Sequence, residues 1–187
     1  MPVLSQIRSR RGDMFLEDLF AEASKFMDSG GSVLWAIVVL LFVMWTLIFE
    51  RMWYLRGAVS RDVNIALEKW ESRSERQSRR ARQVREKLIS EVSIKIDENI
   101  MMIKTLVALA PLFGLLGTVT GMIVVFDVMA FTGGGDAKAM AGGVSKATVP
   151  TMSGMVAALS GVFGLTYVER HAEREKHLLE DHLTMDH

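Results

Sequence analysis

Three long runs of uncharged residues, separated by strongly charged segments, dominate the pattern of the chain. The runs cover residues 30–49, 105–126 and 147–168. Each is long enough to cross about 30 Å of hydrocarbon as an α-helix that rises 1.5 Å per residue. Buried helices of water-soluble proteins seldom stay uncharged for so long. The pattern therefore predicts an all-α integral membrane protein with three transmembrane helices.

The runs and their flanks divide the chain into seven segments. We expect the transmembrane helices at residues 32–55, 105–131 and 141–168. The segments that remain are an N-terminal part, a long charged middle, a short link and a tail: 1–31, 56–104, 132–140 and 169–187. Acidic residues interrupt the apolar positions of the N-terminal part, so no cleavable signal peptide is expected there.

Residues 13–28 have apolar positions at three- and four-residue spacing, which predicts an amphipathic helix. The apolar positions are Phe15, Leu16, Leu19, Phe20, Ala23, Phe26 and Met27. Asp13 can cap its start, and Gly30–Gly31 can end it. The apolar face lies either on the membrane surface or against the protein's own transmembrane helices.

The distribution of positive charge predicts the orientation of the chain in the membrane. Residues 56–104 carry twelve Lys or Arg residues, the N-terminal segment four, and the link between the second and third spans only Lys138. By the positive-inside rule the middle segment is cytoplasmic. The N-terminus and the link then face the outer side of the membrane, and the tail faces the cytoplasm.

The charged segments are themselves helical in pattern. An apolar stripe runs without interruption from Val84 into the second span, which predicts one long helix over residues 84–131, bent near Pro111. Residues 71–83 are polar and are expected to turn or stay solvated. The tail reads as a charged extension of the third span. These stretches would form long cytoplasmic helical extensions.

Composition excludes several classes of function. The net charge is zero, from 22 basic and 22 acidic residues, which argues against a nucleic-acid partner. No cysteine is present, which excludes disulfides and thiol chemistry. The four histidines lack the spacing that would place two on one helical face, so no metal site is expected. No nucleophile–base pair or phosphate-binding loop is visible, and we expect neither an enzyme nor a cofactor.

The second and third spans differ from the first in their content of small residues. Such residues let helix backbones approach closely in lipid, so these two helices are expected to pack tightly. The packing positions are Gly114, Gly117, Gly121, Gly154, Ala158 and Gly161. Pro111 and Pro150 are expected to kink their helices, because proline removes a backbone donor.

Two threonines and one lysine are the candidate functional residues. Thr118 and Thr151 lie on faces of small residues and could line a polar pore; alternatively, each hydroxyl bonds a carbonyl of its own helix. Lys146 and Asp127 lie near the outer ends of their helices. Ionisable residues at membrane depth are functional candidates, and the alternative is an interfacial side chain that reaches water.

The stretches PLFGLLGTVTGMIVVF and GGVSKATVPTMSGMVAALSG resemble the MotA/TolQ/ExbB proton-channel family, and ExbB most closely. The resemblance implies a homopentamer in the bacterial inner membrane, whose second and third helices surround a pore. An ExbD-like dimer would occupy the pore and carry a proton-binding aspartate. The pair would energise a TonB-like protein for outer-membrane import of siderophore-bound iron, haem or vitamin B12. Thr118 and Thr151 match the pore-lining threonines of the family.

The resemblance is broken at Lys146, where the family places a glutamate. A proton relay through a carboxylate of this subunit is therefore in doubt. Lys146 faces away from the pore, pairs with the acid of the partner, or is neutral; we favour a partner-paired or interfacial lysine. Two other functions stay open: a TolQ-like subunit for outer-membrane integrity, and a structural membrane assembly without ion flux.

Overall fold

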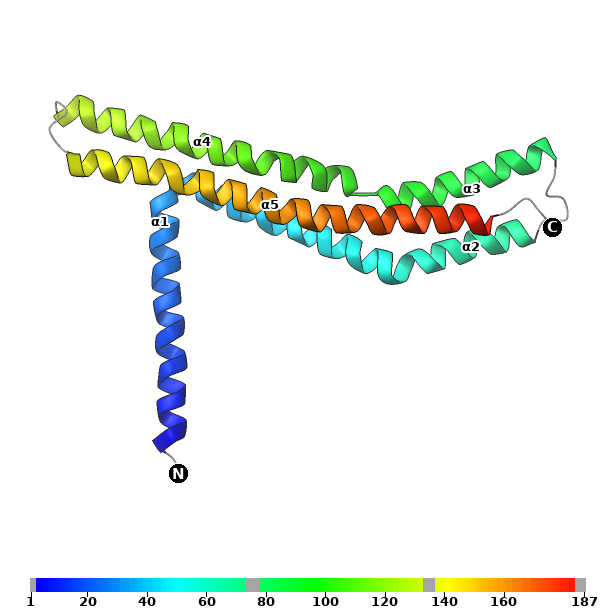
Figure 1. Ribbon diagram of the computed structural model, residues 1–187, viewed down its shortest axis with the longest axis horizontal. Helices are drawn as coiled ribbons and strands as arrows, with labels where there is room; N and C mark the ends of the chain where they lie inside the picture. Colours follow the sequence, from blue (N-terminus) through cyan, green and yellow to red (C-terminus); the bar gives the residue numbers. More distant parts are fainter. Residues whose placement is uncertain (1–2, 73–77, 133–136, 184–187) are drawn as a thin grey trace. The chain divides into compact units, whose positions relative to one another are not determined.

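A computed structural model describes residues 3–72, 78–132 and 137–183; within these ranges, nothing is described of the side chains of residues 3–17, 19, 20, 29, 132, 137 and 139. Every regular element in the described ranges is a helix (Figure 1). The elements are α1 (Val3–Trp53), η1 (Tyr54–Ala58), α2 (Val59–Glu71), α3 (Arg79–Asp97), α4 (Ile100–Thr132) and α5 (Ala137–His182). The short η1 is a single turn of π-helix.

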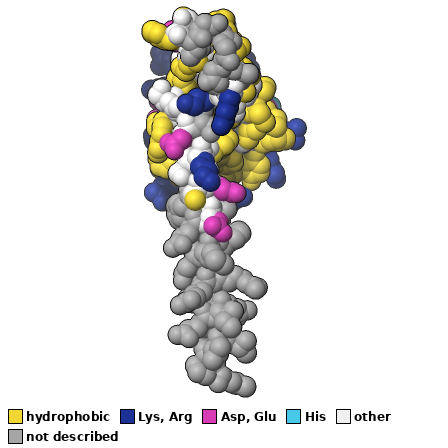
Figure 2. All heavy atoms as spheres, turned by 90° about the vertical axis from the view of Figure 1, so that its left-hand side faces the viewer, with side chains coloured by type: hydrophobic (Ala, Val, Ile, Leu, Met, Phe, Trp, Pro, Cys, Tyr) yellow, Lys and Arg dark blue, Asp and Glu magenta, His cyan; other side chains and the backbone are white. Residues whose placement is uncertain are grey.

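Three stretches of helix are long and apolar enough to cross a membrane. They lie within Gly30–Glu71, Arg79–Phe131 and Met140–His182. Large apolar side chains are exposed on all three, among them Phe42 at 72%, Phe131 at 91% and Phe163 at 70%. On the face seen in Figure 2, hydrophobic side chains reach the surface over a broad area. Apolar surface on this scale suits contact with lipid, and the all-α membrane class predicted from the pattern is confirmed.

Helix α1 is interrupted at Gly31, where the backbone has φ 63° and ψ −156°. Glycine adopts this conformation without steric cost, and the predicted end of the N-terminal helix at Gly30–Gly31 agrees with the break. The predicted start at Asp13 is wrong, because the helix already begins at Val3. No proline follows Pro2 in this stretch to stop it. The side chains of Phe15, Leu16, Leu19 and Phe20 lie outside the described residues.

The predicted continuous helix over residues 84–131 is also wrong. It is two helices, α3 and α4, which are separated at Glu98 and Asn99. Glu98 has an extended ψ of 137°, and Asn99 has a positive φ of 63°. Asparagine tolerates the left-handed region better than most residues. The buried stripe continues across the break through Ile96, Ile100 and Ile103, so hydrophobic spacing alone gives no sign of it.

The polar stretch predicted at residues 71–83 separates two helices. Helix α2 ends at Glu71, and α3 begins at Arg79. Ser78 caps α3: its Oγ accepts a hydrogen bond of 3.2 Å from the backbone N–H of Ala81. Such a cap satisfies one of the donors left free at a helix start.

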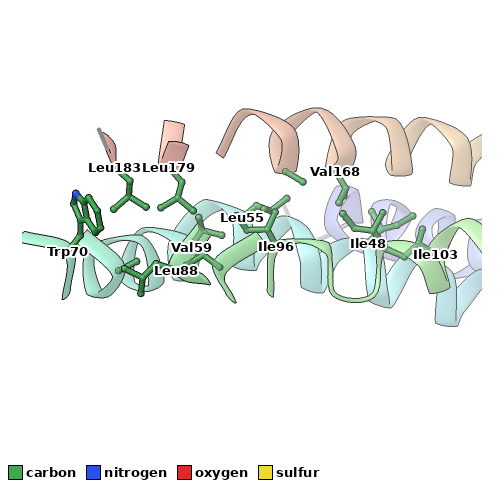
Figure 3. Packing of buried hydrophobic residues seen from close by; sticks show 14 of the residues in the cluster. Ile48, Leu55, Val59, Trp70, Leu88, Ile96, Ile103, Val168, Leu179 and Leu183 are labelled. Atoms are coloured by element: carbon green, nitrogen blue, oxygen red, sulfur yellow. The ribbon is translucent and has the colours of Figure 1, made fainter. Parts of the chain in front are cut away.

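The chain divides into two compact units, and each is described by itself. The first holds the chain up to Val39 together with Ala110–Val156, and the second holds Leu40–Leu109 and the chain from Ala157 onward. The second unit has a continuous apolar core to which all six helical elements contribute (Figure 3). Ile48, Val59, Ile96, Val168 and Leu179 are among its fully buried members. This core aligns the charged helices α2 and α3 with the tail of α5.

Candidate functional site at the contact between α4 and α5

Glycines of α4 in the first unit lie directly against the backbone of α5. A Cβ atom at Gly121 would lie 2.6 Å from the Cα of Ala147, and one at Gly114 would lie 3.0 Å from the Cα of Thr151. A Cβ at Gly117 would overlap Pro150. Real Cβ atoms do not approach other atoms as closely as those at Gly117 and Gly121 would, so the contact leaves no room for a side chain there; at Gly114 a Cβ would fit only if α5 moved by a few tenths of an ångström.

The contact is reciprocal, because α5 also presents glycines to α4. A Cβ atom at Gly154 would lie 2.6 Å from the carbonyl oxygen of Ala110, and Gly143 lies against Val125. The structure thus brings together four of the six predicted packing positions. Gly161 belongs to the second unit, where it lies against Met44 and Val107. Ala158 is half-buried.

Thr151 links the two helices by a hydrogen bond. Its Oγ1 donates to the carbonyl oxygen of Gly114 across the contact, at 3.0 Å. Pro150, next to it, is buried against Gly117. Because Gly114 has no side chain, its carbonyl is accessible to the threonine hydroxyl. Thr151 therefore does not bond a carbonyl of its own helix, which was the alternative for this residue.

Thr118 behaves differently. Its Oγ1 donates to the carbonyl of Leu115, one turn earlier in α4, at 2.7 Å. Thr120, Thr148 and Ser153 likewise bond carbonyls of their own helices. The half-buried Thr118 thus makes the local bond that is common for Ser and Thr in helices, and the structure assigns it no bond to α5 among the described residues.

Lys146 is exposed and lines a cavity of about 220 Å³ in the first unit. The cavity is also lined by Asp28, Ser32 and Thr120, and the exposed Asp127 is not part of its lining. No ion pair joins Lys146 to a carboxylate in the described part of the chain. Its ammonium group is therefore accessible to a ligand or partner that reaches this cavity.

A polar network in the second unit was not predicted. The hydroxyl of Tyr54 donates to Oδ2 of Asp62 at 2.7 Å, and Nζ of Lys95 donates to Oδ1 of the same carboxylate at 2.9 Å. It joins η1, α2 and α3. Tyr54 and Asp62 are 8 residues apart, but Lys95 follows Asp62 by 33 residues and belongs to another helix, so sequence spacing could not reveal the whole network.

The two charged groups of this network stabilise each other. The hydrogen bond from Lys95 lowers the pKa of the Asp62 carboxyl below its ordinary value, and the same bond raises the pKa of Lys95. Both groups are charged between about pH 4 and pH 10. The contribution of the pair to folding is lost as the pH falls through the lowered pKa of Asp62 or rises through the raised pKa of Lys95.

A second cavity, of about 460 Å³, lies between α3, the start of α4 and the tail of α5 in the second unit. Two ion pairs form part of its lining: Lys104 with Glu169 at 2.6 Å and Lys176 with Asp97 at 2.5 Å. These pairs are partly exposed and contribute little energy individually. They connect the tail of α5 to both sides of the break between α3 and α4.

Comparison with known proteins identifies the family of this chain. A stretch of 61 residues is 44% identical to a protein of Synechocystis sp. named as a biopolymer transport protein, ExbB-like 1. The match covers 31% of this chain and 24% of that relative, so the chain corresponds to a minor part of its length. No solved structure matches. The sequence profile of the MotA/TolQ/ExbB proton channel family matches residues 57–181, more than half of the chain and including all of α4. The protein belongs to the MotA/TolQ/ExbB proton channel family.

Proposed function

We propose that this protein is an ExbB-like subunit of the bacterial inner membrane that forms a homopentameric pore. The pore would hold an ExbD-like dimer, and proton flow through the pair would energise a TonB-like protein for import across the outer membrane. Family membership and three apolar helices support the proposal. The charged helices α2 and α3 and the tail of α5 would be cytoplasmic, as the excess of Lys and Arg in residues 56–104 suggests.

The observation that carries the proposal is the pair of threonines on the closely packed α4 and α5. Each hydroxyl donates its one hydrogen to a backbone carbonyl. Thr118 donates to Leu115, and Thr151 donates to Gly114. A hydroxyl oxygen keeps acceptor lone pairs after it has donated. Each threonine can therefore accept a hydrogen bond from a protonated carboxyl. Such a face would favour the proton-loaded form of the partner's aspartate over the ionised form.

Lys146 would complement this face at the outer end of α5. Its free ammonium lies about one and a half helical turns before Thr151, on the basis of 3.6 residues per turn. An ionised partner carboxylate would be stabilised there, and a protonated one at the threonines. The carboxylate that takes part in proton transfer would thus come from the partner alone.

Replacement of the threonines tests whether the chain conducts protons or only builds an assembly. Valine has the shape of threonine without the hydroxyl. We expect Thr118→Val to reduce partner-dependent transport at least tenfold, and Thr118→Ser to retain it. Transport would be measured as uptake of a TonB-dependent substrate in cells that express the partner. Thr166→Val is the matched control, because its hydroxyl also bonds its own helix, at Val162.

Thr151→Val gives a less direct reading than Thr118→Val. It also removes the bond to Gly114, and bonds between membrane helices are worth about 0.6 kcal/mol on average. The amount of the Thr151→Val protein in the membrane must therefore be compared with the amount of the Thr151→Ser protein, so that a loss of stability is not taken for a loss of transport. If both valine variants transport like the parent, the proposal of a proton-conducting pore is wrong, and a structural assembly without ion flux is favoured.

A TolQ-like role would be favoured instead by a neighbouring gene for a Pal-type lipoprotein.

A further inference from the structure

Arg51 is a buried charge near the end of α1. Its side chain is 3% exposed, and it is the only charged residue that is buried in the described part of the chain. A buried guanidinium is strongly unfavourable unless ion pairs and hydrogen bonds compensate for its lost hydration. The groups that contact Arg51 must therefore compensate for its lost hydration, and they show which part of the chain it stabilises.

The guanidinium of Arg51 binds the last turn of α3. Its Nη1 donates to the carbonyl oxygen of Lys95 at 2.8 Å, and its Nη2 lies 3.3 Å from Oε2 of Glu98. The last four carbonyls of a helix have no partner within the helix, and a cation is favoured at that end. Arg51 thus supplies from α1 the donor that α3 lacks where it stops.

The break between α3 and α4 is tied to the same place on α1. Asn99, the residue with positive φ, donates from Nδ2 to Oε2 of Glu50 at 3.4 Å. The same oxygen of Glu50 accepts from Nε of Arg51 at 3.1 Å. The carbonyl of Asn99 in turn accepts the N–H of Ile103 and so begins α4. Two adjacent residues of α1 therefore hold both sides of the break.

We propose that Glu98–Asn99 is a joint between α3 and α4, and that Arg51 is the positioning residue that fixes its angle. Without Arg51 the end of α3 would have an unpaired carbonyl and an unpaired carboxylate, and nothing else among the described contacts would hold Glu98. The joint sets the direction in which α4 leaves the charged helices. This proposal about the joint concerns the geometry of the chain and goes beyond the proposed function. It can therefore be tested without measuring ion flux and without a partner protein.

The distance between two spin labels across the joint measures its angle. The chain has no cysteine, so introduced cysteines are the sole attachment sites. Ser90 on α3 and Ala108 on α4 are both exposed and belong to the same unit. A continuous helix would separate these two backbone positions by about 27 Å, from 108 − 90 = 18 residues at 1.5 Å each. When the labelled full-length chains are diluted with an excess of unlabelled chains, which suppresses distances between copies, the protein in lipid should give a single, narrow distance distribution.

Four variants distinguish a change in the geometry of the joint from a general loss of stability. Asn99→Gly keeps positive φ accessible and should retain the parent mean distance, whereas Asn99→Ala disfavours it and should shift the mean toward the value of a continuous helix. Arg51→Gln should broaden the distribution at least twofold. Arg82→Gln removes an exposed arginine of α3 for which no side-chain contact is described, and it should change nothing.

The result that would overturn the proposal is a folded Arg51→Gln protein with the distribution of the parent. An Asn99→Ala protein that matches Asn99→Gly in mean distance would overturn it as well. If Arg51→Gln does not fold, Arg51→Lys decides the matter. Lysine keeps the charge but lacks the guanidinium fork that reaches Lys95 and Glu98 together. A parent-like width for Arg51→Lys would then rule out the positioning role.

Discussion

Thr118 and Thr151 show how the same side chain acquires different roles from its neighbours. Thr151 faces Gly114, where the missing side chain leaves a carbonyl of the other helix within 3.0 Å. Thr118 has no bond to α5 among the described contacts, and its hydroxyl bonds the carbonyl of Leu115 in its own helix. The sequence places both on faces of small residues, but it cannot say which carbonyl is nearer, because that depends on the register of α4 against α5.

Lys146 stands at the position where the resemblance to the family leads us to expect a glutamate. We expect Lys146→Ala to weaken association with an ExbD-like partner roughly tenfold, which corresponds to about 1.4 kcal/mol for a lost, partly desolvated ion pair. Lys146→Arg should retain association. Co-purification of the partner at graded salt concentrations would measure the effect, and Lys69→Ala, on the exposed face of α2, is the control.

Two outcomes would change the role of Lys146. If the Lys146→Ala protein binds the partner as well as the parent does, Lys146 is an interfacial lysine that reaches water. Stronger association of Lys146→Glu would mean that the partner presents a cation at this level instead of an acid. The charge of the partner group can thus be determined from this single position.

At the scale of elements, the contact of α4 with α5 depends on missing atoms. Gly121 meets Ala147 with no space for a Cβ, and Gly117 meets Pro150 in the same way. Membrane helices gain little from burying apolar surface, since lipid is equally apolar, so close backbone contact is what stabilises their association. The glycines therefore hold the pair together by letting it approach.

Gly121→Ala should separate the helices locally and lower the thermal midpoint of the purified protein by several degrees, since overpacking costs about 1–3 kcal/mol. Gly142→Ala is the matched control, because a Cβ at Gly142 would have no neighbour within 4 Å. That variant should be neutral or slightly stabilising. The loss should persist in the double variant Gly121→Ala, Ala147→Gly, because the Cα and the backbone nitrogen of residue 147 would still lie 2.6 and 2.8 Å from the added Cβ. Equal midpoints for Gly121→Ala and Gly142→Ala would contradict the contact.

The class and number of the membrane helices were predictable, whereas the joint between α3 and α4 was not. Long uncharged runs indicate membrane-spanning helices. The break at Gly31 follows from glycine, which adopts a positive φ without steric cost. The break at Asn99 lies inside an unbroken apolar stripe. The role of Arg51 was unpredictable for a different reason: its partners Lys95 and Glu98 are distant in sequence and are brought to it only by packing.

At the scale of the whole molecule, the exposed apolar side chains must be covered by lipid or by other chains. A pore requires several copies, so we expect a purified oligomer whose mass corresponds to five chains of 20.9 kDa. Co-expression with an ExbD-like protein should raise that mass by two partner chains. Native mass spectrometry in detergent would measure both values.

A monomer in both preparations would contradict the proposed function. An oligomer that never takes up the partner would favour the structural assembly instead. The distance measurement at the α3–α4 joint stays informative in either case, because it needs only a folded chain.

The contact between Gly121 and Ala147 also has a consequence for how this gene can change over generations. A mutation that adds a methyl group at position 121 meets the Cα and the backbone nitrogen of residue 147 as well as its Cβ, so no substitution at position 147 makes room for it. We therefore expect codon 121 to keep encoding glycine among descendants of the gene, whatever residue comes to stand at position 147.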